Sequence, residues 1–154
     1  MPKSIRRHSK KRGTRRNKGD KGNRSMQNFE REVVVKFIQT LNLVKLYHWK
    51  THSYATHKAT DELYTKLNDN MDTFVEVLLG KQGDRVNLTM VKTISLKAVT
   101  SLGEFKREID KFKAYLVDLN NCPALKSMSN SDLYNIRDEI LGNINQLLYL
   151  LTFK

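Results

Sequence analysis

Residues 48–76 read HWKTHSYATHKATDELYTKLNDNMDTFVE, and the rest of the chain is arranged around this stretch. It begins with a His-Trp pair and a short polar segment, and its apolar residues then recur with the period of a helix. Four polar side chains fall on one stripe of that helix, at about 0°, 40°, 60° and 100° around its axis, namely His57, Asp61, Asp72 and Glu76. One histidine and three carboxylates beside an apolar stripe are a candidate set of metal ligands.

The spacing keeps these four side chains from meeting on one ion within a single chain. His57 and Asp61 are one helical turn apart, and so are Asp72 and Glu76, but about 16 Å of helix rise separates the two pairs. Two antiparallel copies of the helix, related by a two-fold axis near residues 66–67, would bring the first pair of one subunit against the second pair of the other. The sequence therefore predicts two equivalent sites per dimer.

Apolar periodicity predicts three further helices. The first has an apolar face so wide that we expect it to be covered on more than one side, with His48 on the core-facing side at its end. The opening stretch is expected to end its helix at Gly80 in a left-handed conformation. Residues 80–95 then predict a long crossover. The expected helices cover residues 26–47, 56–79, 96–119 and the segment after residue 132. This pattern predicts an all-α four-helix bundle.

Residues 1–25 differ in composition from the rest of the chain. Eleven of the 28 Lys and Arg residues but only one of the 16 acidic residues lie there, so this segment carries +10 of the net charge of +12. A segment so charged and so poor in apolar residues cannot fold alone. We expect a disordered basic tail over residues 1–25 and the bundle over residues 26–154. The basic residues of the tail are Lys3, Arg6, Arg7, Lys10, Lys11, Arg12, Arg15, Arg16, Lys18, Lys21 and Arg24.

A flexible cationic arm suits contact with phosphates that does not depend on base sequence. The tail therefore predicts nonspecific DNA binding, and its lack of aromatic residues makes base stacking an unlikely contribution. Other roles of the tail stay open: a solubility function, RNA or an acidic protein as partner, or a targeting signal such as the basic run KKRGTRR.

Composition also limits where the protein is expected to work. Cys122 is the only cysteine, so no intrachain disulfide can form. No apolar run has the length of a membrane span, and the N-terminus lacks the apolar core of a secretory signal. We expect an intracellular, DNA-associated protein (of a nucleoid, a nucleus or a virion) that is neither secreted nor membrane-bound.

The opening stretch resembles the Dps family of DNA-protecting, ferritin-like proteins. Members have a His-Trp pair, a second histidine, an Asp four residues later, another Asp eleven residues on and a Glu four residues after that. The matching residues here are His48, Trp49, His57, Asp61, Asp72 and Glu76. The chain departs from the family where the interval from His-Trp to the second histidine is three residues shorter, with His52 inside it. No helix carries the Glu-x-x-His pair of a site within one bundle.

The resemblance implies a ferritin-like four-helix bundle that forms a homo-oligomer, at least a two-fold dimer and in the family a dodecameric cage. It implies a non-haem iron site between subunits, where Fe²⁺ is oxidised by peroxide or dioxygen and then stored, which protects DNA. Other divalent metals suit the same ligands. The implied ligands are His48, His57 and Asp61 of one chain with Asp72 and Glu76 of its partner, with Trp49 beside the iron and His52 as the alternative to His48.

A second interpretation belongs to a different class. A non-enzymatic helical protein that packages DNA in a chromosome or a virion would use the same scaffold and tail but keep only a degenerate metal site. A third interpretation is a mitochondrial or nuclear protein whose tail is only an address. Metal content and assembly mass distinguish the first two, because a metal-loaded dodecamer supports the iron cage.

Overall fold

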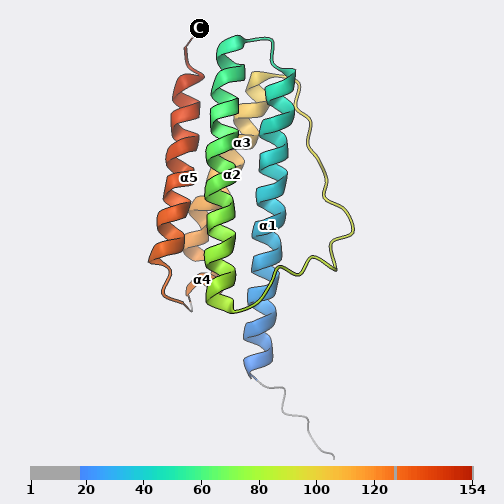
Figure 1. The fold of residues 1–154 in the computed structure, drawn as a ribbon, viewed down its shortest axis with the longest axis vertical. Coiled ribbons are helices and arrows are strands. Elements are labelled where there is room, and N and C mark those ends of the chain that lie inside the picture. Colours follow the sequence, from blue (N-terminus) through green and yellow to red (C-terminus); the bar gives the residue numbers. More distant parts are fainter. Residues whose placement is uncertain (1–17, 127, 154) are drawn as a thin grey trace, which may run out of the picture.

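The computed structural model describes residues 18–126 and 128–153, and this part of the chain is helical with no strand. Four long helices form a bundle, and two short helical turns join the last two of them (Figure 1). The elements are α1 Lys18–Lys50, α2 Tyr54–Gln82, α3 Leu102–Asp118, the 3₁₀ turn η1 Leu119–Asn121, α4 Pro123–Lys126 and α5 Ser131–Leu150. The predicted all-α four-helix bundle is confirmed.

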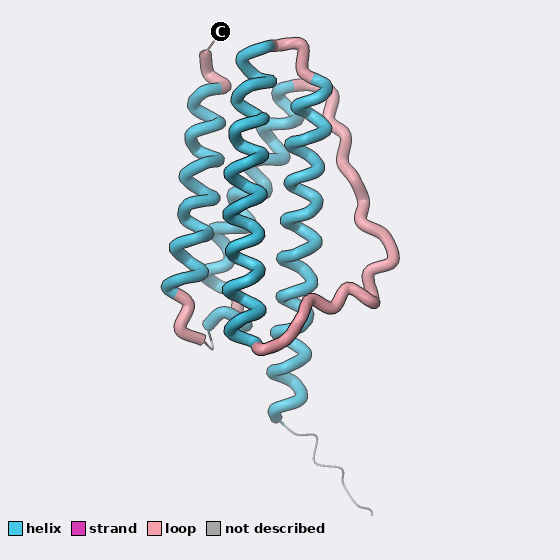
Figure 2. The backbone as a smooth tube through the Cα atoms, in the orientation of Figure 1, coloured by secondary structure: helices cyan, strands magenta, loops and turns pink. Residues whose placement is uncertain are grey.

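The helices follow an up-down-down-up order. α1 and α2 run antiparallel, a long loop then returns along the side of the bundle, and α3 runs in the direction of α2 before α5 comes back (Figures 1 and 2). α2 packs against α1 and α5, and α3 packs against the same two helices from the other side. A loop of this length is required because parallel helices cannot be joined by a tight turn.

Aromatic side chains from three helices meet in the core. Phe37 of α1 makes edge-to-face contacts with Phe74 of α2, at 5.4 Å between ring centroids, and with Phe112 of α3, at 6.1 Å. Nearer the α1–α2 turn, Tyr47 stacks on Phe105 at 4.3 Å. These contacts set the rotation of α1 relative to its neighbours.

No helix of the described residues is both long and apolar enough to cross a membrane.

α1 begins at Lys18, earlier than the predicted start at residue 26. Once the turns after Met26 are fixed by packing, each further helical residue adds a backbone hydrogen bond at little cost, and no proline intervenes. Among the residues of α1 whose side chains are described, 25–50, the first buried one is Met26. Residues 1–17, with their eight basic residues, lie outside the described part of the chain, and so do the side chains of residues 18–24.

The ends of α2 have clear local causes. Ser53 caps the N-terminus, where its Oγ accepts a hydrogen bond from the Thr56 amide at 3.3 Å. The predicted C-terminal stop at Gly80 is wrong: Gly83 takes the left-handed conformation, with φ of 68°, and its amide donates to the Leu79 carbonyl at 2.8 Å. The helix passes through Gly80 because an internal glycine costs only about 1 kcal/mol.

α3 starts later than predicted, at Leu102 rather than at residue 96. Ser101 Oγ accepts from the Glu104 amide at 3.2 Å, while Glu104 Oε2 accepts from the Thr100 amide at 2.7 Å and from its hydroxyl at 2.8 Å. These bonds from Thr100 hold the pKa of Glu104 below its usual value. The Ser-x-x-Glu spacing is readable in the sequence as a capping box, and it marks the true start of this helix.

The crossover, residues 83–101, lies along α1. Arg31 Nε donates to the Asn87 carbonyl, and Gln39 Nε2 donates to the Ser95 carbonyl, both at 3.4 Å. Val99 is buried at the end of the crossover. The prediction that α1 is covered on more than one side is therefore confirmed.

Glu30 of α1 is a buried carboxyl group beneath the crossover, with an exposed fraction of 4%. Burial raises the pKa of this carboxyl, and the charge of Asp84 raises it further; Arg31 and the backbone of Asn87 act in the opposite direction. The folded chain therefore binds this proton more tightly than the unfolded chain. Its stabilising effect is complete below the pKa of the unfolded state and is lost as the pH rises through the raised pKa.

We predict that Glu30→Gln raises the melting temperature at pH 7, because an amide needs no charge in this buried position. The difference from the parent protein should shrink as the pH falls toward about 4, where the parent carboxyl is protonated. Thermal unfolding followed by circular dichroism between pH 4 and 8 measures this. Glu32→Gln, at an exposed position of α1, is the matched control. A difference that is constant with pH would contradict the prediction.

Candidate metal half-site

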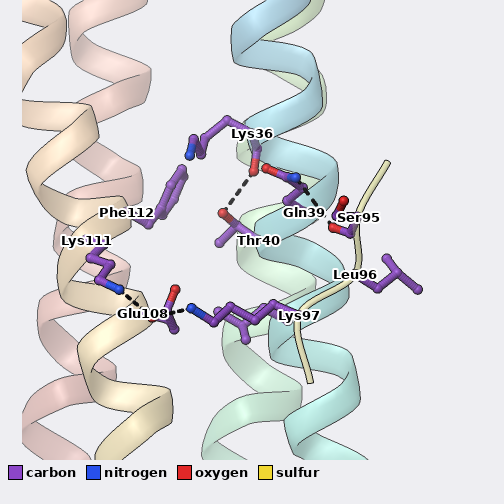
Figure 3. A pocket seen from close by; sticks show the side chains of 10 residues that line it. Lys36, Gln39, Thr40, Ser95, Leu96, Lys97, Glu108, Lys111 and Phe112 are labelled. Carbon is purple, nitrogen blue, oxygen red and sulfur yellow. Dashed lines mark hydrogen bonds and ion pairs between the residues drawn. The ribbon is translucent and has the colours of Figure 1, made fainter. Parts of the chain in front are cut away.

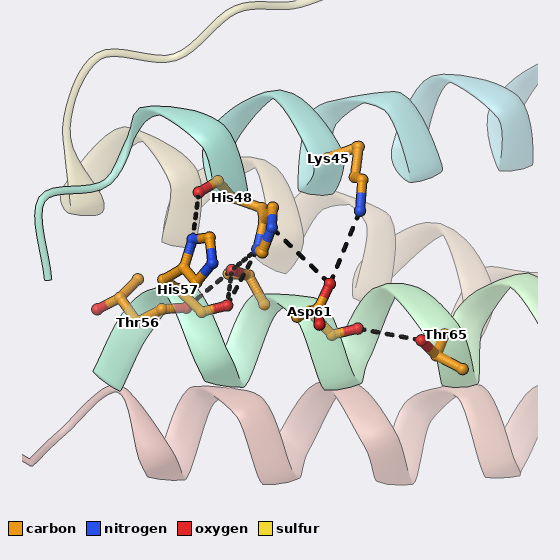
Figure 4. Close-up of polar contacts among 7 residues, drawn as sticks. Lys45, His48, Thr56, His57, Asp61 and Thr65 are labelled. Carbon is orange, nitrogen blue, oxygen red and sulfur yellow. Dashed lines mark hydrogen bonds and ion pairs between the residues drawn. The ribbon is translucent and has the colours of Figure 1, made fainter. Parts of the chain in front are cut away.

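Two histidines join the end of α1 to the start of α2 (Figure 4). His48 Nδ1 lies 3.0 Å from the carbonyl oxygen of His57, and His57 Nδ1 lies 3.0 Å from the carbonyl oxygen of His48. The two rings stack with their centroids 3.8 Å apart and an angle of 24° between their planes. We call this pair the histidine clasp. It spans the short turn of residues 51–53.

The clasp fixes which nitrogen of each ring carries a proton. A carbonyl oxygen only accepts hydrogen bonds, so Nδ1 of both rings must be the donor. The hydroxyl of Thr60 donates to the Thr56 carbonyl at 2.8 Å, so toward His48 Nδ1, 3.4 Å away, its oxygen can only accept. In a neutral ring Nε2 then keeps its lone pair. Metal-binding histidines are commonly oriented by this type of bond from the other nitrogen to a carbonyl.

Asp61 faces the free nitrogen of His48. The distance from Asp61 Oδ1 to His48 Nε2 is 3.8 Å, and to Lys45 Nζ it is 3.7 Å. A separation of 3.8 Å is too long for a hydrogen bond. Two ligand atoms that bind one transition metal at about 2.1 Å lie roughly 3 to 4 Å apart. His48 and Asp61 therefore have the separation of a ligand pair, with Lys45 supplying the positive charge beside the carboxylate.

Lys45 is a member of this site that the sequence interpretation missed. Its ammonium lies 4.7 Å from the centroid of the Tyr64 ring and 5.8 Å from that of Trp49, in addition to its contact with Asp61. The sequence did contain an indication that Lys45 lies near His48, because it precedes His48 by three residues and so shares its side of α1. Trp49 itself is 68% exposed, so its contact here is with a cation at the surface.

The turn distinguishes the two candidate histidines by position. His48 is buried, with an exposed fraction of 6%, and it is directed at α2. His52 is exposed in the turn. Because α2 already begins at Tyr54, the shortened segment forms a tight turn that keeps His48 against Asp61.

Asp72 and Glu76 do not join this cluster within one chain. Both are exposed, farther along α2, on the side that also carries Asp61. Among residues 18–126 and 128–153, no group of three or more His, Cys, Asp or Glu side chains is placed to hold a metal ion. Leu67 is buried in the bundle core, and the exposed residue at the middle of the acidic stripe is Asn68. The structure places His48 beside both His57 and Asp61, and it leaves the exposed Asp72 and Glu76 apart from them. We call His48, His57 and Asp61 the candidate half-site, although by themselves they are not placed as a group that could hold a metal ion.

We predict that His57→Ala destabilises the fold by about 1–2 kcal/mol, because the His48 carbonyl loses its donor and the stacked ring is removed. Urea unfolding at pH 7.5 measures the change. His52→Ala is the matched control, and it should change stability by less than about 0.5 kcal/mol because its side chain is exposed. Equal effects of the two variants would contradict a structural role of the clasp.

Comparison with known proteins places the chain in a family. Residues 48–151 match the model of a family of unknown function, DUF5856. The match begins at the first histidine of the clasp and includes α2, the crossover, α3 and α5. No curated protein and no solved structure matches the chain. Because the matched segment is well over half of the chain, this protein belongs to DUF5856.

Proposed function

We propose that this protein oxidises ferrous iron at sites shared between two subunits and associates with DNA through its basic tail, as Dps proteins do. The observation that carries the proposal is the histidine clasp, in which both Nδ1 atoms bond to carbonyl oxygens and Nε2 of His48 lies 3.8 Å from Asp61 Oδ1. The single long crossover supports it, because ferritin-like bundles have one such connection. Imidazole and carboxylate ligands together suit iron.

A two-fold dimer would complete the site. If two α2 helices pack antiparallel with the axis at the level of residues 66–67, the outward carboxylates of one subunit approach the candidate half-site of the other. Each ion would then be held by the half-site together with the partner subunit's Asp72 and the partner subunit's Glu76. The same operation generates a second, equivalent site. Asp61, Asp72 and Glu76 are all exposed in the single chain, so a second subunit can reach them.

The charge of the proposed interface couples formation of the dimer to binding of a metal ion. Such an interface would bring three carboxylates together, and Lys45 alone cannot neutralise them. A divalent cation between the subunits supplies the missing charge, and like-charge repulsion opposes the pairing without it. When iron takes the place beside Asp61, the ammonium of Lys45 keeps its position over the Tyr64 ring, 4.7 Å from the centroid, as a second contact.

The proposed reaction consumes iron as a substrate. Two ferrous ions each give one electron to one molecule of hydrogen peroxide, whose oxygen–oxygen bond breaks to give two hydroxide ions. Dioxygen is the alternative oxidant and takes four electrons. The carboxylates hold the hard ferric product, and the neutral histidines hold the ferrous ion. In a cage the ferric ions would move on to a stored mineral, and removal of iron together with peroxide protects nearby DNA.

One contact favours the second candidate function, a DNA-packaging protein without iron chemistry. The pair between Lys45 and Asp61, at 3.7 Å, already places a positive charge where an ion would bind. If this pair is permanent, the site is degenerate and the scaffold and the tail alone carry the function. The outcome of the iron assay separates the two candidates.

We predict that the protein, mixed with ferrous iron and peroxide in the absence of air, develops ferric absorbance faster than the same mixture without protein. Asp72→Ala combined with Glu76→Ala should reduce that rate to the uncatalysed level, because half of each shared site is lost. The matched control is Glu62→Gln with Asp69→Asn, two exposed carboxylates that line pockets between α2 and α5. Circular dichroism confirms that both variants stay folded. Equal rates in the parent and the first variant would refute the iron site and favour the packaging protein.

We predict that deletion of residues 1–25 abolishes retention of DNA in gel-shift assays but leaves iron oxidation intact. This cut ends just before Met26, so it removes none of the buried core residues of the described part of the chain. If about eight phosphates are contacted, the logarithm of the affinity should fall with the logarithm of salt concentration at a slope of about −7. A full-length variant with glutamine at the eight basic positions of residues 1–17 controls for chain length. DNA retention by the deleted protein would instead assign the DNA surface to the bundle.

A further inference from the structure

A cavity of about 390 Å³ opens between α1, α3 and the crossover (Figure 3). Its size lies in the range of small-molecule binding sites. It lies along the α1–α3 side of the bundle, so it shares no residue with the histidine clasp between α1 and α2. Its lining combines apolar side chains with charged ones, among them Leu43, Leu96, Phe112, Lys36, Lys97 and Glu108.

The inner wall of the cavity is apolar. Phe112 of α3 and Leu43 of α1 are buried core residues that also line it, with exposed fractions of 3% and 6%. Leu96 of the crossover lines the cavity too, although it is 59% exposed. The hydroxyl of Thr40 donates its hydrogen to the Lys36 carbonyl at 2.9 Å. Because this hydrogen is already donated, Thr40 has none to offer a bound anion. The charged donors that can contact an anion are therefore the lysines of the lining.

The rim carries an excess of positive charge. Lys97 and Lys111 both contact the same oxygen of Glu108, at 2.7 Å, and hydrogen bonds from Lys111 and Lys97 hold the pKa of Glu108 below its usual value. This group of two cations and one anion keeps a charge of +1. The ammonium of Lys36 makes no ion pair within the described residues, and its neighbour is the Tyr115 ring, 5.6 Å to the centroid. Together the lining charges sum to +2.

We propose that this cavity binds a small organic anion with a flat apolar body. The body packs on Leu96 and on the small exposed parts of Phe112 and Leu43, and the acidic group takes Lys36 as its counter-ion at the rim. Figure 3 shows the ammonium of Lys111 directed at Glu108, whereas no contact is drawn to the ammonium of Lys36, so Lys36 is the cation left to meet an anion in the cavity. The lining charge of +2 disfavours a cation, and a neutral ligand would gain no ion pair with Lys36.

The experiment is a calorimetric titration of the full chain with 2-naphthoate, and with 2-naphthalenemethanol as the uncharged counterpart. We expect saturable binding of one naphthoate per chain and at least about ten-fold weaker binding of the alcohol, as for the loss of one charged hydrogen bond. Lys36→Gln should weaken naphthoate about ten-fold and leave the alcohol unchanged. Equal affinity for the acid and the alcohol, or no saturable binding of the acid, would overturn the proposal.

Two control variants locate the binding. Lys113→Gln removes a positive charge from α3 at a position that lines a different surface pocket, so it should leave naphthoate binding unchanged. Tyr54→Ser removes an aromatic ring, 75% exposed, at the end of the bundle. Naphthoate affinity that falls in either control as much as in Lys36→Gln would assign the binding to general charge or to the exposed aromatic end, and the cavity would be rejected.

Discussion

The hydrogen bonds exchanged by His48 and His57 hold the end of α1 against the start of α2. A helix end leaves its last carbonyl groups without partners inside the helix, and the carbonyl of His48 obtains one from the His57 ring at 3.0 Å. The return bond fixes His48 in turn. One structural requirement, the closing of a tight turn, therefore also determines which nitrogen of each ring is free. Any metal chemistry of this protein depends on that orientation.

The crossover imposes the second constraint. α2 and α3 run in the same direction, so the chain must return along the bundle, and it does so over α1. Two side chains of α1, Arg31 and Gln39, donate to its carbonyl groups. The loop buries Glu30 near one end and leaves an open cavity near the other. A segment with little regular structure covers a helix less closely than another helix would, because its side chains cannot interdigitate at a fixed period.

Sequence periodicity located the four long helices, but local capping decided their ends. α2 continues past Gly80 and is capped by Gly83. α3 begins only after its N-cap residue, Ser101, although apolar residues occur earlier in the sequence. The polar stripe of α2 was also readable, since the placement of His57, Asp61, Asp72 and Glu76 on one side of the helix follows from helical geometry alone. Lys45 was missed because its role comes from α2 across the interface: Asp61 and Tyr64 give it partners that its own helix does not show.

Composition and periodicity are enough to predict the helical class, the order of the long helices, the clustering of basic residues near the N-terminus, and the separation of His57 and Asp61 from Asp72 and Glu76 along one helix. These follow from composition and from the fixed rise and rotation of a helix per residue. The tertiary structure decided which histidine faces Asp61, which ring nitrogens are free, and that Asp72 and Glu76 point away from their own chain. Those properties depend on contacts between helices, where hydrogen bonds and packing select one side-chain orientation among several that the local sequence allows.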